Sequence, residues 1–310
     1  MSSLPQPTNG LAPARKTIYL VTGASRGLGK GLVAAFLLRP HSTVIAGVRN
    51  PATQRASLDE LPVADSSTLI IVQLDCASKT DALDAVRTLQ ADHGISHLDV
   101  VIANAAIAAN YGPASTMPLE YLEQHIQVNA YAVLLLFQAT RLLLQAAVSG
   151  PRCRPHPPPP SSSPSTPPSP PAASEDPETQ HAQQPCPSPQ FICVGAPIST
   201  ITEMESCARA PLTNYALSKL AACYLVRKFH FENHWLIAYI VDPGVWFWSG
   251  LARHIQSDMG AQAARLFGRK EAPTTINESV AGICTRMAEA RKETTSGRFV
   301  LFEDGSDVAW

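Results

Sequence analysis

The sequence lacks an excess of charge of either sign. Its 24 lysines and arginines are balanced by 25 aspartates and glutamates, so the formal net charge is −1 at pH 7. Proteins that bind nucleic acid or an anionic membrane surface depend mainly on clustered basic residues. We therefore expect no nucleic acid and no membrane among the partners of this protein.

Long uninterrupted apolar runs are also missing. The amino-terminal segment MSSLPQPTNGLAPARK is polar and contains no apolar core of a secretory signal. The most apolar run, AVLLLFQATRLLLQAAV, is interrupted by Gln138, Thr140, Arg141 and Gln145, whereas a membrane-spanning helix needs about 20 predominantly apolar residues. These absences predict a cytoplasmic protein.

The cysteines lack the spacing of a metal site or a redox pair. Seven cysteines are present, but none forms a CxxC pair and none has a histidine at ligand spacing. We expect free thiols and no metal, with Cys76 and Cys193 acting as small hydrophobic residues in or beside strands.

Large apolar residues are scarce in one internal segment, 151–190, which holds more than half of the 27 prolines. Such a composition cannot bury enough surface to offset the entropy of ordering, so we expect a disordered Pro/Ser-rich insertion. A proline-motif partner could bind it. The alternative is a solvated insertion without a partner.

Outside this insertion, apolar strand-like runs alternate with helical patterns. The runs cover 16–23, 42–50, 67–76, 97–106, 190–196, 235–244 and 297–305, and the helical patterns cover 27–40, 81–94, 118–147 and 211–226. Near-continuous apolar strands alternating with helices indicate a parallel sheet covered on both faces, which right-handed crossovers make doubly wound. We expect an α/β Rossmann domain in two parts, 16–150 and 191–310, preceded by a disordered tail at 1–15.

A glycine-rich loop follows the first strand and opens the first helix. Its sequence, TGASRGLG, places Gly23, Ser25, Arg26, Gly27, Leu28 and Gly29 where backbone can approach a pyrophosphate and helix N–H groups can bind it. The alternative is a structural turn. The strand–loop–helix context favours a dinucleotide site.

Two arginines indicate which nicotinamide cofactor binds. Rossmann domains that prefer NAD carry an acidic residue at the end of the second strand, but this chain has Arg49 there, and Arg26 lies in the glycine loop. Guanidinium groups form charge-assisted hydrogen bonds with phosphate. The pair therefore favours the 2′-phosphate of NADP(H), unless both are only solvated surface charges.

Tyr215 and Lys219 lie four residues apart in the helical pattern of 211–226. This spacing places them on one helix face. A free tyrosine has a pKa of about 10, and a nearby cation lowers it. The pair could therefore supply a general acid to a carbonyl substrate, or it could be an ordinary pair on an amphipathic helix.

The motifs TGASRGLG, LDCAS, ANAAIA, VNAYA, YALSK and VDPG resemble those of the short-chain dehydrogenase/reductase family in order and spacing. The likeness covers nearly the whole chain outside the tail and the insertion. Segments such as STITEME and SGRFVLFEDG are similar to fungal ketoreductases of polyketide pathways. The resemblance implies an oxidoreductase that transfers hydride between NADP(H) and a small-molecule carbonyl substrate, assembled as a homodimer or homotetramer.

The resemblance also implies residue roles. Asp75 would bind the adenine, Asn104 would line the adenosine side, and Asn129 would support a water-linked proton relay. Tyr215 would be the general acid, and Lys219 would bind the nicotinamide ribose and lower the tyrosine pKa. Val245 and Ser257, after the sixth strand, complete the implied cofactor site.

Two departures qualify this picture. Ala196 stands where the family has its catalytic serine, so we consider Ser199 or Thr200 as substitutes, against an ordinary loop role. An aromatic stretch near 247–255 interrupts the motif after Gly244 and would line or crowd a substrate pocket. The sequence thus favours an NADPH-dependent ketoreductase of aromatic polyketide metabolites. The alternative is a catalytically impaired NADP-binding regulatory or scaffold protein.

Overall fold

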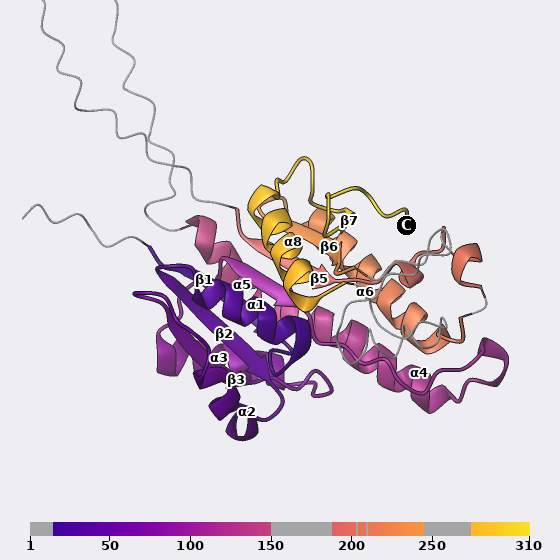
Figure 1. Ribbon diagram of the computed structural model, residues 1–310, viewed down its shortest axis with the longest axis horizontal. Coiled ribbons are helices and arrows are strands. Elements are labelled where there is room, and N and C mark those ends of the chain that lie inside the picture. The colour runs from indigo at the N-terminus through magenta and orange to yellow at the C-terminus, as the bar shows by residue number, and fades with distance from the viewer. Residues whose placement is uncertain (1–14, 150–187, 203, 209, 245–273) are drawn as a thin grey trace, which may run out of the picture.

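The computed structural model describes residues 15–149, 188–202, 204–208, 210–244 and 274–310 (Figure 1). The expected tail at 1–15 and the expected insertion at 151–190 lie almost entirely outside these residues. Both therefore stay predictions, as does the division of the domain around the insertion.

The described strands form one seven-stranded sheet in the order β3-β2-β1-β4-β5-β6-β7, and every pairing is parallel. This arrangement confirms the predicted doubly wound sheet. The chain builds outward from β1 in one direction and from β4 in the other, so the topological switch point lies between them. The strands are β1 (Thr17–Thr22), β2 (Ser42–Val48), β3 (Thr68–Gln73), β4 (Val100–Ala103), β5 (Gln190–Val194), β6 (Ile237–Asp242) and β7 (Phe299–Leu301).

Helices cover both faces of the sheet (Figure 1). Alternate residues of β1 show why: Ile18 and Leu20 enter one apolar core, and Tyr19 and Val21 enter the other. The first core packs against α3 (Asp81–His93), α5 (Ala132–Ser149) and α6 (Thr213–Glu232), and the second against α1 (Gly27–Leu37) and α8 (Ile276–Glu289). The sequence analysis did not predict α8, nor the short α2 (Pro51–Asp59) beside β3.

The predicted long helix is continuous but contains a widened turn. It comprises α4 (Leu119–Ile126), a π-helical turn at Gln127–Tyr131 and α5. By length and composition alone the stretch Leu119–Ser149 could cross a membrane. Its side chains Leu136, Phe137 and Leu144 are instead buried in the core against the sheet, so it is built as a core helix of the domain.

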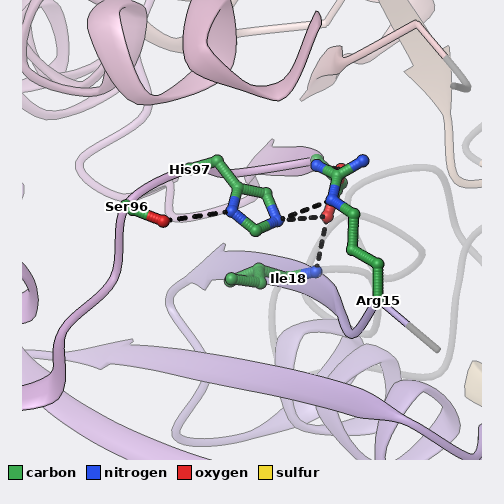
Figure 2. A network of polar contacts seen from close by, with 5 residues as sticks. Arg15, Ile18, Ser96 and His97 are labelled. Atoms are coloured by element: carbon green, nitrogen blue, oxygen red, sulfur yellow. Dashed lines mark hydrogen bonds and ion pairs between the residues drawn. The ribbon is translucent and has the colours of Figure 1, made fainter. Parts of the chain in front are cut away.

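A buried carboxylate joins the amino-terminal ends of β1 and β4. Asp99 accepts hydrogen bonds from the Ile18 backbone N–H at 2.8 Å and from Arg15 Nη2 at 2.6 Å. His97 adds a contact between its Nε2 and Asp99 Oδ2 at 3.5 Å (Figure 2). This network fixes the amino-terminal ends of the two central strands. Ligands of such sheets bind at the opposite, carboxyl ends of the strands.

We expect Asp99→Ala to lower the free energy of unfolding by about 2–4 kcal/mol, because it leaves a buried backbone N–H and a cation without their partner. Urea denaturation followed by circular dichroism measures the change. Asp84→Ala is the control, since Asp84 forms an exposed pair with Arg87 and its removal should cost under about 1 kcal/mol. Equal losses in the two variants would contradict this role for Asp99.

Candidate functional site

A cavity of about 860 Å³ opens at the carboxyl ends of the central strands. It extends from the glycine loop and the ends of β2 and β3, across the end of β4, to the start of α6. This position spans the switch point between β1 and β4, where open α/β sheets bind their ligands. Most of the residues predicted for a cofactor line it: Gly23, Ser25, Arg26, Gly27, Leu28, Gly29, Arg49, Asp75, Asn104, Tyr215 and Lys219.

The glycine loop is packed too closely for side chains. Gly23 has a φ of 66°, and a Cβ added there would lie 2.9 Å from Ala105 Cα. A Cβ on Gly29 would lie 2.2 Å from the Gly23 carbonyl oxygen and 2.6 Å from Asn104 Nδ2. The loop therefore brings bare backbone and the first N–H groups of α1 to the cavity, which fits the pyrophosphate of a dinucleotide.

Asn104 holds the glycine loop against the end of β4. Its Nδ2 donates to the Thr22 carbonyl oxygen at 2.9 Å, and the backbone N–H groups of Asn104 and Ala105 each donate to Thr22 Oγ1 at 3.1 Å. The side chain predicted to line the adenosine side thus lines the cavity and also fixes the shape of the loop.

The end of β2 presents basic and amide groups to the cavity. Arg49 follows β2 directly, and Asn50, Gln54 and Arg26 line the same region. Asp75 lies across from them after β3, where its Oδ1 accepts the Ala77 backbone N–H at 2.9 Å. No acidic side chain follows β2, so the region suits a phosphate better than a ribose hydroxyl.

Tyr215 and Lys219 lie in the first two turns of α6 and both line the cavity, as their spacing predicted. Lys219 is buried and its Nζ donates to the Val194 carbonyl oxygen at 2.5 Å. This bond anchors the ammonium at the end of β5. It uses one of the three donors that a lysine carries.

The prediction that Lys219 lowers the pKa of Tyr215 stays a prediction. Burial raises the pKa of Tyr215 above its usual range, and the neighbouring Tyr111 and Asp242 add to the increase. The physical reason is that burial takes the charged phenolate out of water, which disfavours the ionised form. The Lys219 Nζ is held at the Val194 carbonyl oxygen. Tyr215 therefore keeps its proton at neutral pH.

Asn129 lies in the π-helical turn but does not line the cavity. It is buried, and its side chain accepts from the Ile107 N–H at 2.8 Å and donates to the Ile107 carbonyl oxygen and to Ser218 Oγ, each at 2.9 Å. The side chain thus ties the loop after β4 to α6 and positions that loop. Its part in a water-linked proton relay stays a prediction.

Ser199 does not reach the cavity. It is buried in a 3-10 turn, and its Oγ lies 3.3 Å from Cys223 Sγ on α6. Thr200 is likewise buried, with its Oγ1 donating to the Pro197 carbonyl oxygen. Ala196 packs in the apolar cluster next to Tyr215 and brings no hydroxyl there. Neither proposed substitute serine or threonine therefore replaces the missing hydroxyl.

Val245, Ser257 and the aromatic stretch at 247–255 lie outside the described residues, so their predicted roles stay predictions. In the described part of the chain, no group of three His, Cys, Asp or Glu side chains could hold a metal ion.

The sequence analysis missed three residues around the loop after β4. Tyr111 lines the cavity, and His125 and Asn214 hold the loop backbone from α4 and α6. The one sequence signal for any of them is that Asn214 directly precedes Tyr215. Nothing in the local pattern around Tyr111 or His125 indicates that they meet.

A parallel α/β domain with a bare glycine loop and a Tyr/Lys pair on one cavity defines a dinucleotide-linked oxidoreductase. Residues 17–150 match the short chain dehydrogenase family. The chain belongs to this family, and the prediction that it is an oxidoreductase of the family is confirmed.

Among characterised relatives, the chain is 68% identical to norsolorinic acid ketoreductase stcE of Emericella nidulans, over 96% of this chain and 94% of that protein. It is 53% identical to the norsolorinic acid ketoreductase of Aspergillus parasiticus, over 96% of this chain and 93% of the relative. The narrower resemblance to fungal polyketide ketoreductases is thereby confirmed.

Solved structures share the fold. The NADPH-bound carbonyl reductase from chicken fatty liver superposes with a TM-score of 0.70 at 22% identity, covering 96% of this chain and 95% of that one. The carbonyl reductase Sniffer of D. melanogaster gives a TM-score of 0.70 at 18% identity, with 96% and 100% coverage.

Proposed function

We propose that this protein is an NADPH-dependent ketoreductase that reduces a carbonyl group of an aromatic polyketide, such as norsolorinic acid, to an alcohol. The observation that carries the proposal is the shared cavity: the glycine loop, Arg49 and the Tyr215/Lys219 pair all line it. The 68% identity to a norsolorinic acid ketoreductase supports the substrate class.

In the proposed reaction, the chain's own residues bind the cofactor, orient the substrate and protonate the substrate oxygen. The glycine loop and the amino terminus of α1 would hold the pyrophosphate, and Arg26 and Arg49 the 2′-phosphate. Lys219, anchored on Val194, would use its other donors for the ribose. A nicotinamide cofactor supplies the hydride when bound.

Tyr215 is the proposed proton donor. As hydride adds to the carbonyl carbon, the C=O π bond breaks and its electrons move to oxygen, which then takes the Tyr215 proton. Tyr215 is protonated at neutral pH before reduction begins, because burial raises its pKa above that of a free tyrosine. The proton on Tyr215 is later restored from solvent.

The direct test is NADPH oxidation at 340 nm by the purified full chain, with norsolorinic acid and a panel of aromatic ketones as substrates. We expect turnover with an aryl ketone and formation of its alcohol. NADPH binding without turnover on any member of the panel would instead favour the impaired scaffold protein, which the missing hydroxyl at Ala196 motivates. The homodimer or homotetramer expected from the family resemblance stays a prediction.

Arg49→Ala is expected to raise the Kd for NADPH about 10–100-fold and to leave the Kd for NADH unchanged. The reason is the loss of charge-assisted hydrogen bonds to the 2′-phosphate, worth about 1.5–3 kcal/mol. Quenching of protein fluorescence on titration measures both affinities. Arg55→Ala is the control, because Arg55 is exposed on α2 and does not line the cavity. An equal loss for NADH would contradict a role in reading the phosphate.

A further inference from the structure

The site lacks a second hydroxyl where the family places its serine. Ala196 follows β5 and packs in an apolar cluster with Ile198, Cys207 and Leu212, so its methyl group offers no hydrogen bond to a substrate oxygen. A carbonyl oxygen that gains negative charge is stabilised most by donors fixed in advance. With Tyr215 alone, the substrate oxygen would have a single hydroxyl donor at this end of the cavity.

Few described residues could supply the hydroxyl that is missing at Ala196. Four cavity-lining residues of the described chain carry a hydroxyl group: Ser25, Thr53, Tyr111 and Tyr215. Ser25 lies in the glycine loop and Thr53 lies on α2, both at the cofactor end of the cavity. Among the described residues, Tyr111 is therefore the one cavity-lining hydroxyl besides Tyr215 at the end formed by α6 and β5.

Tyr111 packs against the apolar cluster to which Ala196 belongs. Both Tyr111 and Tyr215 lie against the apolar cluster that contains Ala196. Tyr111 is half-buried and faces the cavity. Tyr215 also lines this cavity, so both phenols face one space beside the same apolar cluster.

The backbone that carries Tyr111 is held firmly. Asn110 adopts a φ of 52°, a conformation that costs free energy for a residue other than glycine. Asn214 Nδ2 donates to the carbonyl oxygens of Ala109 and Asn110 at 3.1 Å each, and His125 Nε2 accepts the Ala109 N–H at 3.2 Å. Gly112 pairs with Leu212 just before α6. The loop is thus fixed to the helix that carries Tyr215.

Within the described residues, the Tyr111 hydroxyl has one hydrogen bond, and it is local. Its Oη donates to the Ala108 carbonyl oxygen, three residues earlier, at 3.0 Å. Burial raises the pKa of Tyr111, so its proton remains available for donation at neutral pH.

We infer that the Tyr111 hydroxyl donates the second hydrogen bond to the substrate carbonyl oxygen, in place of the serine hydroxyl that the chain lacks at Ala196. The inference rests on the proposed ketone reduction. Tyr111 binds the oxygen as negative charge develops on it and keeps its own proton, while Tyr215 transfers one. Tyr111 would then be a catalytic residue that contacts substrate.

Tyr111→Phe removes only the hydroxyl oxygen, and we expect it to lower kcat/KM for norsolorinic acid about 10²-fold or more. The Kd for NADPH and the melting temperature should stay unchanged. Tyr121→Phe is the matched control, since Tyr121 is exposed on α4 and does not line the cavity. A kcat/KM of Tyr111→Phe within twofold of the wild type would overturn the inference.

A rescue experiment separates binding of the substrate oxygen from a structural role. Adding Ala196→Ser to Tyr111→Phe should restore kcat/KM at least tenfold, whereas Ala196→Ser alone should change it much less. Loss of activity in Tyr111→Phe with no recovery in the double variant would assign Tyr111 a structural role and end the proposal.

A binding measurement does not depend on turnover. In the dead-end complex with NADP⁺, calorimetry should show norsolorinic acid binding about tenfold more weakly to Tyr111→Phe than to the wild type, a difference of about 1.4 kcal/mol. Equal affinities would count against the hydrogen bond. Failure of the proposed function is distinguishable, because the wild type itself would then show no NADPH oxidation with the ketone.

Discussion

Tyr215→Phe should lower kcat for ketone reduction about 10³-fold while the Kd for NADPH stays unchanged. Phenylalanine keeps the ring that packs against the Ala196 cluster but has no proton to give to the substrate oxygen. General acid catalysis by a positioned group contributes about 10²–10⁴-fold. The measurements are steady-state NADPH oxidation and a fluorescence titration of the cofactor.

The control is Tyr224→Phe, which makes the same change on the same helix at a residue that is 66% exposed. It should leave both kcat and cofactor affinity unchanged. Wild-type turnover in Tyr215→Phe would reject Tyr215 as the proton donor.

The pH profile provides a second measurement of the same group. Because burial raises the pKa of Tyr215, its protonated form persists to higher pH than that of a free tyrosine, with its pKa of about 10. Reductive kcat/KM of the wild type should therefore show no loss from a phenol titration between pH 6 and 9. A loss in this range that is absent in Tyr215→Phe would show that Tyr215 ionises earlier.

Gly29→Ala should raise the Kd for NADPH by more than about 100-fold and destabilise the fold. The new Cβ would lie 2.2 Å from the Gly23 carbonyl oxygen, and backbone cannot move aside without opening the loop. Overpacking of this kind costs about 1–3 kcal/mol, and the displaced loop would no longer present its N–H groups to a pyrophosphate.

Gly31→Ala makes the same change on the same helix. Its Cβ would meet side-chain atoms of α8 instead, Val280 Cγ2 at 2.9 Å and Ile276 Cγ2 at 3.1 Å, and alanine favours the helix by about 1 kcal/mol. Its NADPH affinity should stay close to that of the wild type. Comparable losses of affinity in both variants would show that any added volume on α1 disturbs the site, and would contradict a special role of the glycine loop.

Local sequence was sufficient to predict those features whose pattern and function lie within one segment. The alternation of apolar runs predicted the parallel sheet, and TGASRGLG predicted a bare loop between β1 and α1. Spacing alone placed Tyr215 and Lys219 on one face of α6. Each of these features depends on backbone geometry that repeats every few residues, so it can be read without knowing the contacts.

Contacts between distant segments could not be read in this way. Whether Ser199 reaches the cavity depends on the 3-10 turn after β5, which directs its hydroxyl to Cys223. The pKa of Tyr215 is raised by burial and by neighbours from other elements, such as Tyr111 and Asp242. The expectations for Ser199 and for the pKa of Tyr215 considered α6 and the loop after β5 without the residues that pack around them.

The sequence by itself therefore determined the family, the doubly wound sheet, the glycine loop and the Tyr/Lys pair. Only the tertiary structure placed Tyr111 on the same cavity and against the same apolar cluster as Tyr215. The loop that carries Tyr111 is held by His125 from α4, Asn129 from the π-helical turn and Asn214 from α6. Their hydrogen bonds join residues far apart in the chain, and the packing of the whole domain determines where such residues meet.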